Sequence, residues 1–310
     1  MSIPKPLKDR LAIPAIAAPM FLVSGPQLVI ETCRNGLLGS FPALNARTSD
    51  IFTQWLEEIT QALASAPEAA PFAVNLIVHK TNTRLQDDIA LVVKYRVPLV
   101  ITSLGLAPEL IAAVHSYGGL VFHDVIGARH AAKALEAGVD GIIAVAAGAG
   151  GHAGTVNPFA MIAELRPLLG DKTLVLAGSI GNGAAIAAAR VAGADMAYLG
   201  TRFIATRESL APDDYKQMLV ASRASDVVYT DKLSGVHANF LAPSILRNGL
   251  DLATLTKPEK IDVADDVKVW KDLWSAGHGV GGIDDVPTTG ELCTRLKQEY
   301  RAALAAIAAD

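Results

Sequence analysis

The sequence predicts an α/β fold, a (β/α)8 barrel with a small, mostly helical insertion after the eighth strand. The first observation behind this prediction is the regular alternation of short apolar runs with helical patterns, which is typical of parallel sheets. The second is the number of apolar runs, because eight of them follow one another before residue 206. The third is the composition: 51% of the 310 residues are hydrophobic and 19% are charged, which is enough apolar material for one large core.

The expected strands are short and rich in valine, isoleucine and leucine, as is usual for strands that are buried on both faces. The stretches between them place apolar residues every three or four positions, which predicts helices. Glycines that follow several of these helices, among them Gly138 and Gly193, are typical stop signals. The expected strands cover residues 13–20, 37–42, 72–78, 99–104, 120–125, 141–146, 173–179 and 196–203. The expected helices cover residues 49–66, 83–95, 107–117, 128–137, 158–169 and 184–192.

The alternation of strands and helices ends near residue 206. Residues 207–275 contain charged helical patterns at 212–223 and 256–274, separated by a proline- and asparagine-bearing stretch at 237–248 that predicts a loop. We expect this segment to form a small insertion or lid after the eighth strand.

The last part of the chain is expected to rejoin the barrel. Residues 291–309 show an amphipathic pattern that predicts a closing helix. The sequence therefore predicts two units, a barrel formed by residues 1–206 and 276–310 and an insertion formed by residues 207–275.

Charge and composition argue against several functional classes. The net charge is −4 and no basic run stands out, so we expect no nucleic-acid partner. No apolar run reaches the roughly 18 residues of a membrane-spanning helix, and residues 1–10 lack the apolar centre of a signal peptide. Cys33 and Cys293 lie far apart without metal-ligand spacing, so we expect reduced thiols, a cytoplasmic location and no metal site.

A glycine-rich segment follows the sixth expected strand and carries a single titratable side chain. Residues 146–155 read Ala-Ala-Gly-Ala-Gly-Gly-His-Ala-Gly-Thr. Glycines let the backbone approach a ligand closely, and His152 can accept or donate a proton near neutral pH. Because the active site of a barrel lies at the carboxyl ends of its strands, His152 is the candidate catalytic residue. The alternative is a flexible turn whose histidine lies in water.

The loops after the seventh and eighth expected strands form a candidate phosphate site. Barrel enzymes often bind a phosphate with these two loops and a helix N-terminus. Gly178, Ser179 and Gly181 leave backbone amides accessible just before a helix, whose dipole favours an anion. Gly200 and Thr201 add an amide and a hydroxyl from the second loop. The alternative is two ordinary turns, and the absence of G-x-G-x-x-G after any strand argues against a dinucleotide site.

Six short motifs are spread along nearly the whole sequence. Three are Gly-Gly-His-Ala-Gly at 150–154, Leu-Ala-Gly-Ser-Ile at 176–180 and Leu-Gly-Thr-Arg-Phe at 199–203. The others are Ile-Ala-Ala-Pro-Met at 16–20, Val-Asn-Leu at 74–76 and Trp-Ser-Ala-Gly at 274–277. Together they resemble the nitronate monooxygenases, formerly called 2-nitropropane dioxygenases. Flavin-dependent NADH:quinone reductases and a flavin-dependent enoyl reductase share these motifs, so the motifs identify the superfamily better than the reaction.

The resemblance implies an oxidoreductase with FMN at the top of the barrel and His152 in the catalytic position. It implies oxidation of an alkyl nitronate, such as propionate-3-nitronate, or of a nitroalkane by O2 to a carbonyl compound and nitrite. His152 would remove a proton from the α-carbon of a nitroalkane or, as imidazolium, stabilise a bound nitronate. Asn75 would bond the edge of the flavin ring, and Met20 would pack beneath it. The alternatives are a buried amide whose hydrogen bonds are made within the protein and a methionine that only fills the core. The expected FMN contacts are Ala18, Pro19, Met20, Asn75, Asp124, Gly150, Gly178, Ser179, Gly181, Leu199, Gly200 and Thr201.

Four positions depart from the pattern of the family and leave the substrate open. Many relatives carry glutamine at the position of Val145 and glutamate at that of Gly148. Some carry lysine at the position of Asp124, where an acid reverses the local charge near the flavin. His278 stands where relatives often have glutamine.

Three other functions remain compatible with the sequence. One is an NAD(P)H-dependent FMN reductase that acts on quinones or on an enoyl substrate. The second is a phosphate-binding barrel isomerase or aldolase without flavin. The third is a catalytically inactive FMN-binding protein, and a homodimer is compatible with any of them.

Overall fold

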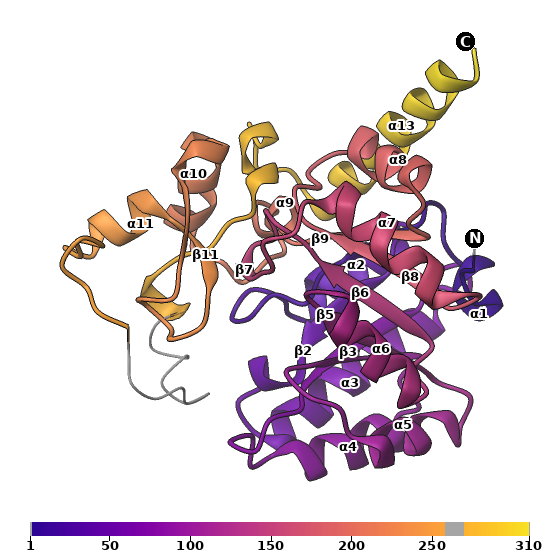
Figure 1. Ribbon diagram of the computed structural model, residues 1–310. Coiled ribbons are helices and arrows are strands. Elements are labelled where there is room, and N and C mark those ends of the chain that lie inside the picture. Colours follow the sequence, from indigo (N-terminus) through magenta and orange to yellow (C-terminus); the bar gives the residue numbers. More distant parts are fainter. Residues whose placement is uncertain (1, 258–269, 310) are drawn as a thin grey trace.

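The computed structural model describes residues 2–257 and 270–309 and contains a barrel of eight parallel strands (Figure 1). The strands pair in the order β1-β9-β8-β6-β5-β4-β3-β2, and a parallel bridge between Ile16 and Leu38 joins the two ends of this sheet. The predicted (β/α)8 barrel is therefore confirmed. Its strands are β1 (Ala15–Ala17), β2 (Gly39–Pro42), β3 (Phe72–Ile77), β4 (Leu99–Ser103), β5 (Leu120–Val125), β6 (Gly141–Val145), β8 (Thr173–Ala177) and β9 (Met196–Leu199).

A ring of helices surrounds the barrel (Figure 1). The helix after the last strand is only α9 (Thr201–Ile204), and the C-terminal helix α13 (Thr289–Ala308) packs between α8 and α2 to complete the ring. Thr288 and Glu291 form a capping box that fixes the start of α13. The other helices are α1 (Lys5–Lys8), α2 (Pro26–Arg34), α3 (Ser49–Ala64), α4 (Leu85–Lys94), α5 (Pro108–His115), α6 (Ala128–Glu136), α7 (Pro158–Leu169) and α8 (Gly183–Ala192).

Side chains along each strand alternate between the barrel interior and the helix layer. On β4, Ile101 belongs to the interior core, whereas Val100 packs against the helices. Phe122 fills the interior from β5. The same alternation turns Ser103 and Asp124, near the carboxyl ends of these strands, to the inside, and both line the cavity described below.

Two of the predicted strands are much shorter in the structure, whereas the others differ by at most two residues. The first was expected over 13–20 but pairs only from Ala15 to Ala17, because Pro14 and Pro19 flank it and proline has no backbone donor. The eighth was expected over 196–203 but ends at Leu199, where the chain turns into α9.

Residues 207–275, where the structure describes them, carry strands as well as helices. They contain α10 (Asp213–Ala221), β10 (Val227–Thr230), β11 (Ala238–Leu241) and α11 (Ala242–Arg247). The predicted loop at 237–248 is therefore wrong, since this stretch forms β11 and α11. Most of the helical pattern expected at 256–274 lies outside the described residues, and the division of the chain into two units stays a prediction.

The strand β11 pairs with a partner from the barrel (Figure 1). This partner is β7 (Gly151–His152), which lies within the glycine-rich segment that follows β6. The pairing is antiparallel, with Ala238 opposite His152 and Asn239 opposite Gly151. The small sheet β10-β11-β7 thus joins the insertion to the carboxyl end of the barrel.

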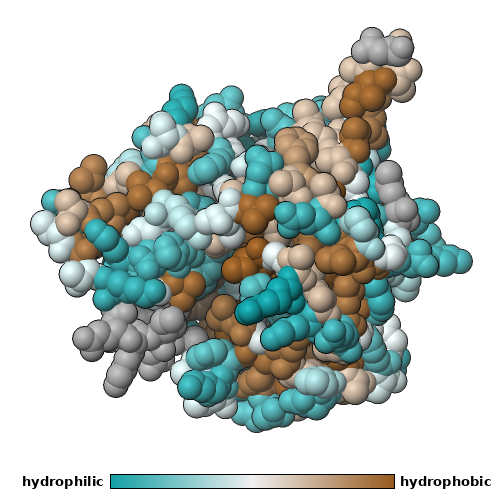
Figure 2. Space-filling model, viewed as in Figure 1, coloured by the Kyte–Doolittle hydropathy of each residue, from teal (hydrophilic) through white to brown (hydrophobic). Residues whose placement is uncertain are grey.

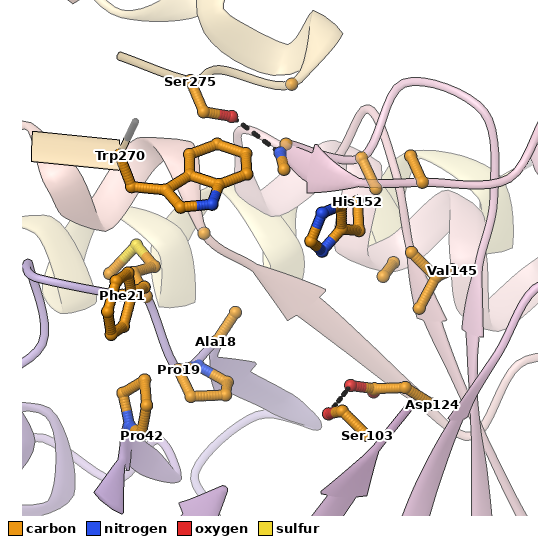
Figure 3. A pocket seen from close by; sticks show the side chains of 18 of the residues that line it. Ala18, Pro19, Phe21, Pro42, Ser103, Asp124, Val145, His152, Trp270 and Ser275 are labelled. Atoms are coloured by element: carbon orange, nitrogen blue, oxygen red, sulfur yellow. Dashed lines mark hydrogen bonds between the residues drawn. The ribbon is translucent and has the colours of Figure 1, made fainter. Parts of the chain in front are cut away.

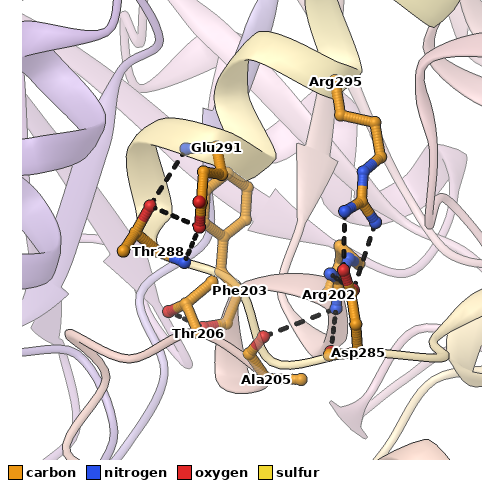
Figure 4. A network of polar contacts seen from close by, with 8 residues as sticks. All are labelled: Arg202, Phe203, Ala205, Thr206, Asp285, Thr288, Glu291 and Arg295. Atoms are coloured by element: carbon orange, nitrogen blue, oxygen red, sulfur yellow. Dashed lines mark hydrogen bonds and ion pairs between the residues drawn. The ribbon is translucent and has the colours of Figure 1, made fainter.

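The segment before α13 is tied to α9 by charged groups (Figure 4). Arg202, which is buried, donates to Asp285 Oδ1 at 2.6 Å, and Arg295 of α13 donates to Asp285 Oδ2 at 2.6 Å. The hydrogen bond from Arg295 and the charges of both arginines hold the pKa of Asp285 below its usual value. This network fixes the turn that follows Gly200 against the end of the chain.

The final turns of α13 project beyond the body of the protein and carry apolar residues (Figure 2). Ile307 in these turns is exposed. None of the helices within residues 2–257 and 270–309 combines the length and the apolar character needed to cross a bilayer.

Candidate active site

A cavity of about 1320 Å³ opens at the carboxyl ends of the barrel strands, where barrel enzymes carry their active sites (Figure 3). Loops after most of the strands contribute to its walls, and the insertion covers one side of it through residues such as Tyr229, Trp270 and Ser275. Its volume exceeds the roughly 300–1,000 Å³ of typical small-molecule pockets. The cavity therefore has room for a cofactor and a second ligand.

The floor of the cavity carries a chain of hydrogen bonds between side chains of three neighbouring strands. Asn75 Nδ2 donates to Ile101 O at 3.2 Å and to Ser103 Oγ at 2.7 Å. Ser103 Oγ donates in turn to Asp124 Oδ2 at 2.5 Å. A carbonyl can only accept, so the contact with Ile101 fixes the orientation of the Asn75 amide. Within the described residues no hydrogen bond uses Asn75 Oδ1, which leaves this acceptor for a ligand with an N–H group.

Two oxygen atoms near this floor are buried without a hydrogen-bond partner in the described part of the chain. They are Asp124 Oδ1 and the hydroxyl of Tyr198 on β9. Burial raises the pKa of the Asp124 carboxyl to about 6, against the lowering effect of the Ser103 hydroxyl. Burial, and after it the charge of Asp124, raises the pKa of Tyr198 well above its ordinary value. Unpaired buried polar atoms are costly, and at a cavity they mark places where a ligand supplies the partner.

His152 lies above this floor and points its ring into the cavity (Figure 3). Its Nε2 is buried and has no partner among the described residues. The indole of Trp270 meets the imidazole edge to face at 5.6 Å between ring centres. Burial lowers the pKa of His152 below its ordinary value, so the imidazole is neutral at pH 7. These features contradict the alternative of a flexible turn with a solvated histidine.

The backbone that leads into His152 is held by the insertion. Gly151 N donates to Ser275 Oγ at 2.6 Å, and Ser275 Oγ donates to Asn239 O at 2.7 Å. Asn239 Nδ2 donates to Ala149 O at 2.6 Å. The Tyr215 hydroxyl donates to Ser275 O. We call these three side chains, Tyr215, Asn239 and Ser275, the His152 clamp.

The candidate phosphate loops also meet at the cavity. Ser179 is exposed there in a left-handed conformation with φ of +58°, which is unusual for a residue with a side chain. Gly200 and Thr201 line the same wall. The first amides of α8 are already used inside the protein, because Gly183 N donates to Glu299 Oε2 at 2.7 Å. The expected contribution of this helix start to anion binding is thus reduced.

The structure brings most of the predicted site residues together and leaves out two. Gly181 lines a separate, smaller cavity, and a Cβ atom added there would lie 2.7 Å from the backbone oxygen of Gly279. Leu199 is fully buried, and its backbone oxygen accepts from Ala18 N. The predicted residues that line the main cavity are Ala18, Pro19, Met20, Asn75, Asp124, Gly150, His152, Gly178, Ser179, Gly200 and Thr201.

Two of the departures from the family pattern lie in contact with each other. Gly148 has φ of +80°, and a Cβ atom there would lie 2.3 Å from Ser179 Oγ and 3.0 Å from His278 Nδ1. His278 N donates to Gly148 O at 2.9 Å. The histidine ring thus occupies the space in which a side chain at position 148 would begin. Val145 lines the cavity wall beside His152 (Figure 3).

Several residues around the cavity were not predicted from the sequence. Ser103 and Tyr198 share the inward face of their strands with the core residues Ile101 and Met196, and this alternation is a signal that could have found them. Asn239 and Trp270 carry no comparable local signal, because only the tertiary fold brings them to His152.

Comparison with known proteins identifies the family. The family model described as nitronate monooxygenase matches residues 78–299. The chain belongs to the nitronate monooxygenase family. The members of this family are flavin-dependent oxidoreductases that act on small molecules.

The curated relatives include dehydrogenases and monooxygenases. A (3aS,4S,5R,7aS)-5-hydroxy-7a-methyl-1-oxo-octahydro-1H-indene-4-carboxyl-CoA dehydrogenase from Rhodococcus jostii is 30% identical, over 72% of this chain and 61% of that protein. The dehydrogenase of the same name from Mycobacterium tuberculosis is 26% identical, with 65% of its length covered. The chain thus spans less than two thirds of these two relatives. A nitronate monooxygenase from Paraburkholderia phytofirmans is 28% identical, over 77% of this chain and 76% of that protein.

Solved structures agree with the fold. The nitroalkane oxidase from Streptomyces ansochromogenes is 26% identical and superposes with a TM-score of 0.82, over 98% of this chain and all of that one. FabK from Thermotoga maritima is 21% identical with the same TM-score, over 98% and 97% of the two chains, and supports the fold alone.

Proposed function

We propose that this protein is an FMN-dependent nitronate monooxygenase that oxidises alkyl nitronates or nitroalkanes with O2 to a carbonyl compound and nitrite. The observation that carries the proposal is His152, whose imidazole lines a cavity with a floor and wall that suit a flavin and whose Nε2 is buried without a partner in the described chain. FMN, when bound, would take electrons from the substrate and pass them to O2.

The residues at the cavity fit FMN in three respects. Asn75 Oδ1 is free to accept a hydrogen bond from a ring N–H, while the Asn75 amide hydrogens are used within the barrel. Gly178, Ser179, Gly200 and Thr201 offer a polar wall for one phosphate. The apolar chain at the end of β1, from Ala18 to Met20, offers a surface on which a ring can pack.

The protein's own part in the chemistry is to bind the substrate and move its proton. Neutral His152 can accept a proton at Nε2 from the α-carbon of a nitroalkane, and its burial keeps it ready as a base. The imidazolium that forms then lies beside the nitronate anion and stabilises it. The His152 clamp holds the backbone that leads into His152, and Trp270 packs edge to face with the imidazole.

The test uses the purified protein as isolated. We expect a yellow protein that releases FMN on heating, and oxygen uptake with nitrite formation when propionate-3-nitronate is added. A colourless protein that binds no added FMN would contradict the proposal and favour a flavin-free isomerase or aldolase. A yellow protein without oxygen uptake on either a nitronate or a nitroalkane would contradict the assigned reaction.

A second candidate is reduction of an enoyl thioester or a quinone with NAD(P)H. The size of the cavity favours this candidate. The exposed cations at the rim also favour it, because they suit a phosphorylated carrier; they are Arg47, Lys133 and Lys271. A relative from Rhodococcus jostii bears the name of a carboxyl-CoA dehydrogenase. Bleaching of the flavin within seconds of anaerobic mixing with NADH or NADPH would favour this candidate.

A further inference from the structure

Asp124 is an acid on the cavity floor, and few neighbouring groups stabilise its negative charge. Ser103 Oγ donates to one carboxyl oxygen, and the other is buried without a partner in the described chain. The barrel interior beneath it is apolar and includes Phe122 and Ile143. Burial raises the pKa of the carboxyl to about 6, so Asp124 is ionised at pH 7–8 but at a cost in free energy.

The strands packed against β5 bring no positive charge to this carboxyl. The charged side chains that line the cavity from the described residues lie at its exposed rim, where water screens them. The side chains that the neighbouring strands turn towards the floor are uncharged at neutral pH: Asn75, Ser103, Val145 and Tyr198. The charged residues of the rim are Arg47, Lys133, Asp214, Arg247, Lys271 and Asp272.

Four histidines also line the cavity, and one of them, His237, is exposed at its rim. His123, the preceding residue, meets Thr102 Oγ1 at 2.8 Å on the helix side of the sheet, and burial lowers its pKa to about 4. His152 lies across the cavity and is neutral for the same reason. His130 is exposed at the rim. A new negative charge in the cavity would therefore face an unshielded carboxylate.

We propose that Asp124 takes up a proton when the flavin bound in this cavity is reduced. The inference rests on the proposed function. A flavin bound here would, on reduction by the substrate, accept two electrons and one proton, which would add one negative charge to the cavity. The Asp124 carboxylate takes one proton from water and becomes a carboxylic acid, which removes one negative charge. Two negative charges in a water-poor cavity repel each other strongly, and protonation of the carboxyl relieves this repulsion.

The test is the number of protons taken up on reduction. The flavin-loaded protein is reduced under anaerobic conditions in weak buffer, and a pH-indicator dye reports the uptake. At pH 7.5 we expect wild type to take up about one proton more per flavin than Asp124→Asn. At pH 5 the two proteins should agree, because the wild-type carboxyl is already protonated.

Matched variants isolate the effect. Asp214→Asn removes a carboxylate from the exposed rim of the same cavity and should keep the wild-type uptake at pH 7.5. His152→Ala should keep it as well, whereas loss of the extra proton in that variant would assign the uptake to His152 and overturn the proposal. Equal uptake by wild type and Asp124→Asn would also overturn it.

A second variant tests the same proposal if Asp124→Asn does not fold. Ser103→Ala retains the carboxyl but removes its one hydrogen-bond donor, so the carboxyl should ionise at higher pH. The pH at which the extra proton first appears should rise accordingly, and an unchanged onset would contradict the proposal. A protein that binds no flavin would overturn the proposed function and this inference together. A wild-type protein that binds flavin but takes up no more protons than Asp124→Asn would overturn this inference alone.

Discussion

Three residues at the site, Asp124, His152 and Tyr198, each have one polar atom that is buried and unpaired in the described part of the chain. These atoms are available for hydrogen bonds or proton transfer to a ligand. For His152 we expect replacement by alanine to cut turnover of a neutral nitroalkane by on the order of 10²-fold or more, since a placed base is lost. Turnover of a pre-formed nitronate should fall less, because that substrate has already lost its proton. FMN content should stay normal.

The control for this variant is His115→Ala, which removes a histidine that pairs with Asp140 at the outer surface of the barrel. It should leave both activities unchanged. Steady-state oxygen uptake with both substrate forms provides the measurement. If the FMN-loaded His152→Ala protein kept activity within a few-fold of wild type on both, His152 would have no catalytic role.

The pH profile is a second test at the residue scale. Burial lowers the pKa of His152, so the base is neutral, and active, at pH values below the ordinary histidine pKa of about 6.5. For a neutral nitroalkane we expect kcat/KM to fall on the acid side only below that pH. An acid limb centred at or above pH 6.5 would show that the imidazole titrates as if it were in water.

At the scale of elements, the pairing of β7 with β11 holds His152 in place. Ser275→Ala removes the acceptor for Gly151 N and the donor to Asn239 O. A single hydrogen bond contributes about 0.5–1.5 kcal/mol, so exchange of the Gly151 amide hydrogen should speed up by about tenfold. Turnover should fall several-fold while FMN stays bound.

Hydrogen exchange followed by NMR or mass spectrometry gives the readout for this variant. Ser116→Ala is its matched control, because that hydroxyl only donates to Ala113 O at the surface. Unchanged exchange at Gly151 in Ser275→Ala would mean that β11 alone holds the strand.

The same elements show where sequence reasoning succeeds and where it stops. Strands and helices of the barrel follow from local apolar patterns. Asn75 and Asp124 were expected near the ligand from the resemblance to the nitronate monooxygenases, and both line the cavity. The strand β7 could not be predicted, since Gly-His has little strand propensity and its contact Ser275 lies 124 positions away. The sequence also could not show that Gly181 lies outside the main cavity, because only the fold packs Gly181 against Gly279.

For the whole molecule, Asp124 makes stability depend on pH. The folded protein holds the Asp124 proton with a pKa of about 6, whereas the unfolded chain holds it with a pKa of 3.8. Between these values the folded state binds more protons, so the free energy of unfolding falls as pH rises, and the loss persists above pH 6. The loss is on the order of 3 kcal/mol.

Asp124→Asn should abolish this dependence. Relative to wild type, its free energy of unfolding should rise between pH 4 and pH 8 by the amount that wild type loses. Urea unfolding at both pH values measures the difference, with Asp214→Asn as the control that follows wild type. A constant offset between Asp124→Asn and wild type at both pH values would contradict the prediction.

The clamp on His152 also sets when the enzyme becomes competent during its synthesis. All eight barrel strands leave the ribosome before the residues that hold β7, because Asn239 and Ser275 follow β9 in the chain. The N-terminal parts of a protein fold first as they emerge. We therefore expect nascent chains arrested before residue 275 to carry the barrel strands without a fixed His152. During translation the barrel strands would thus be present before the residues that fix His152.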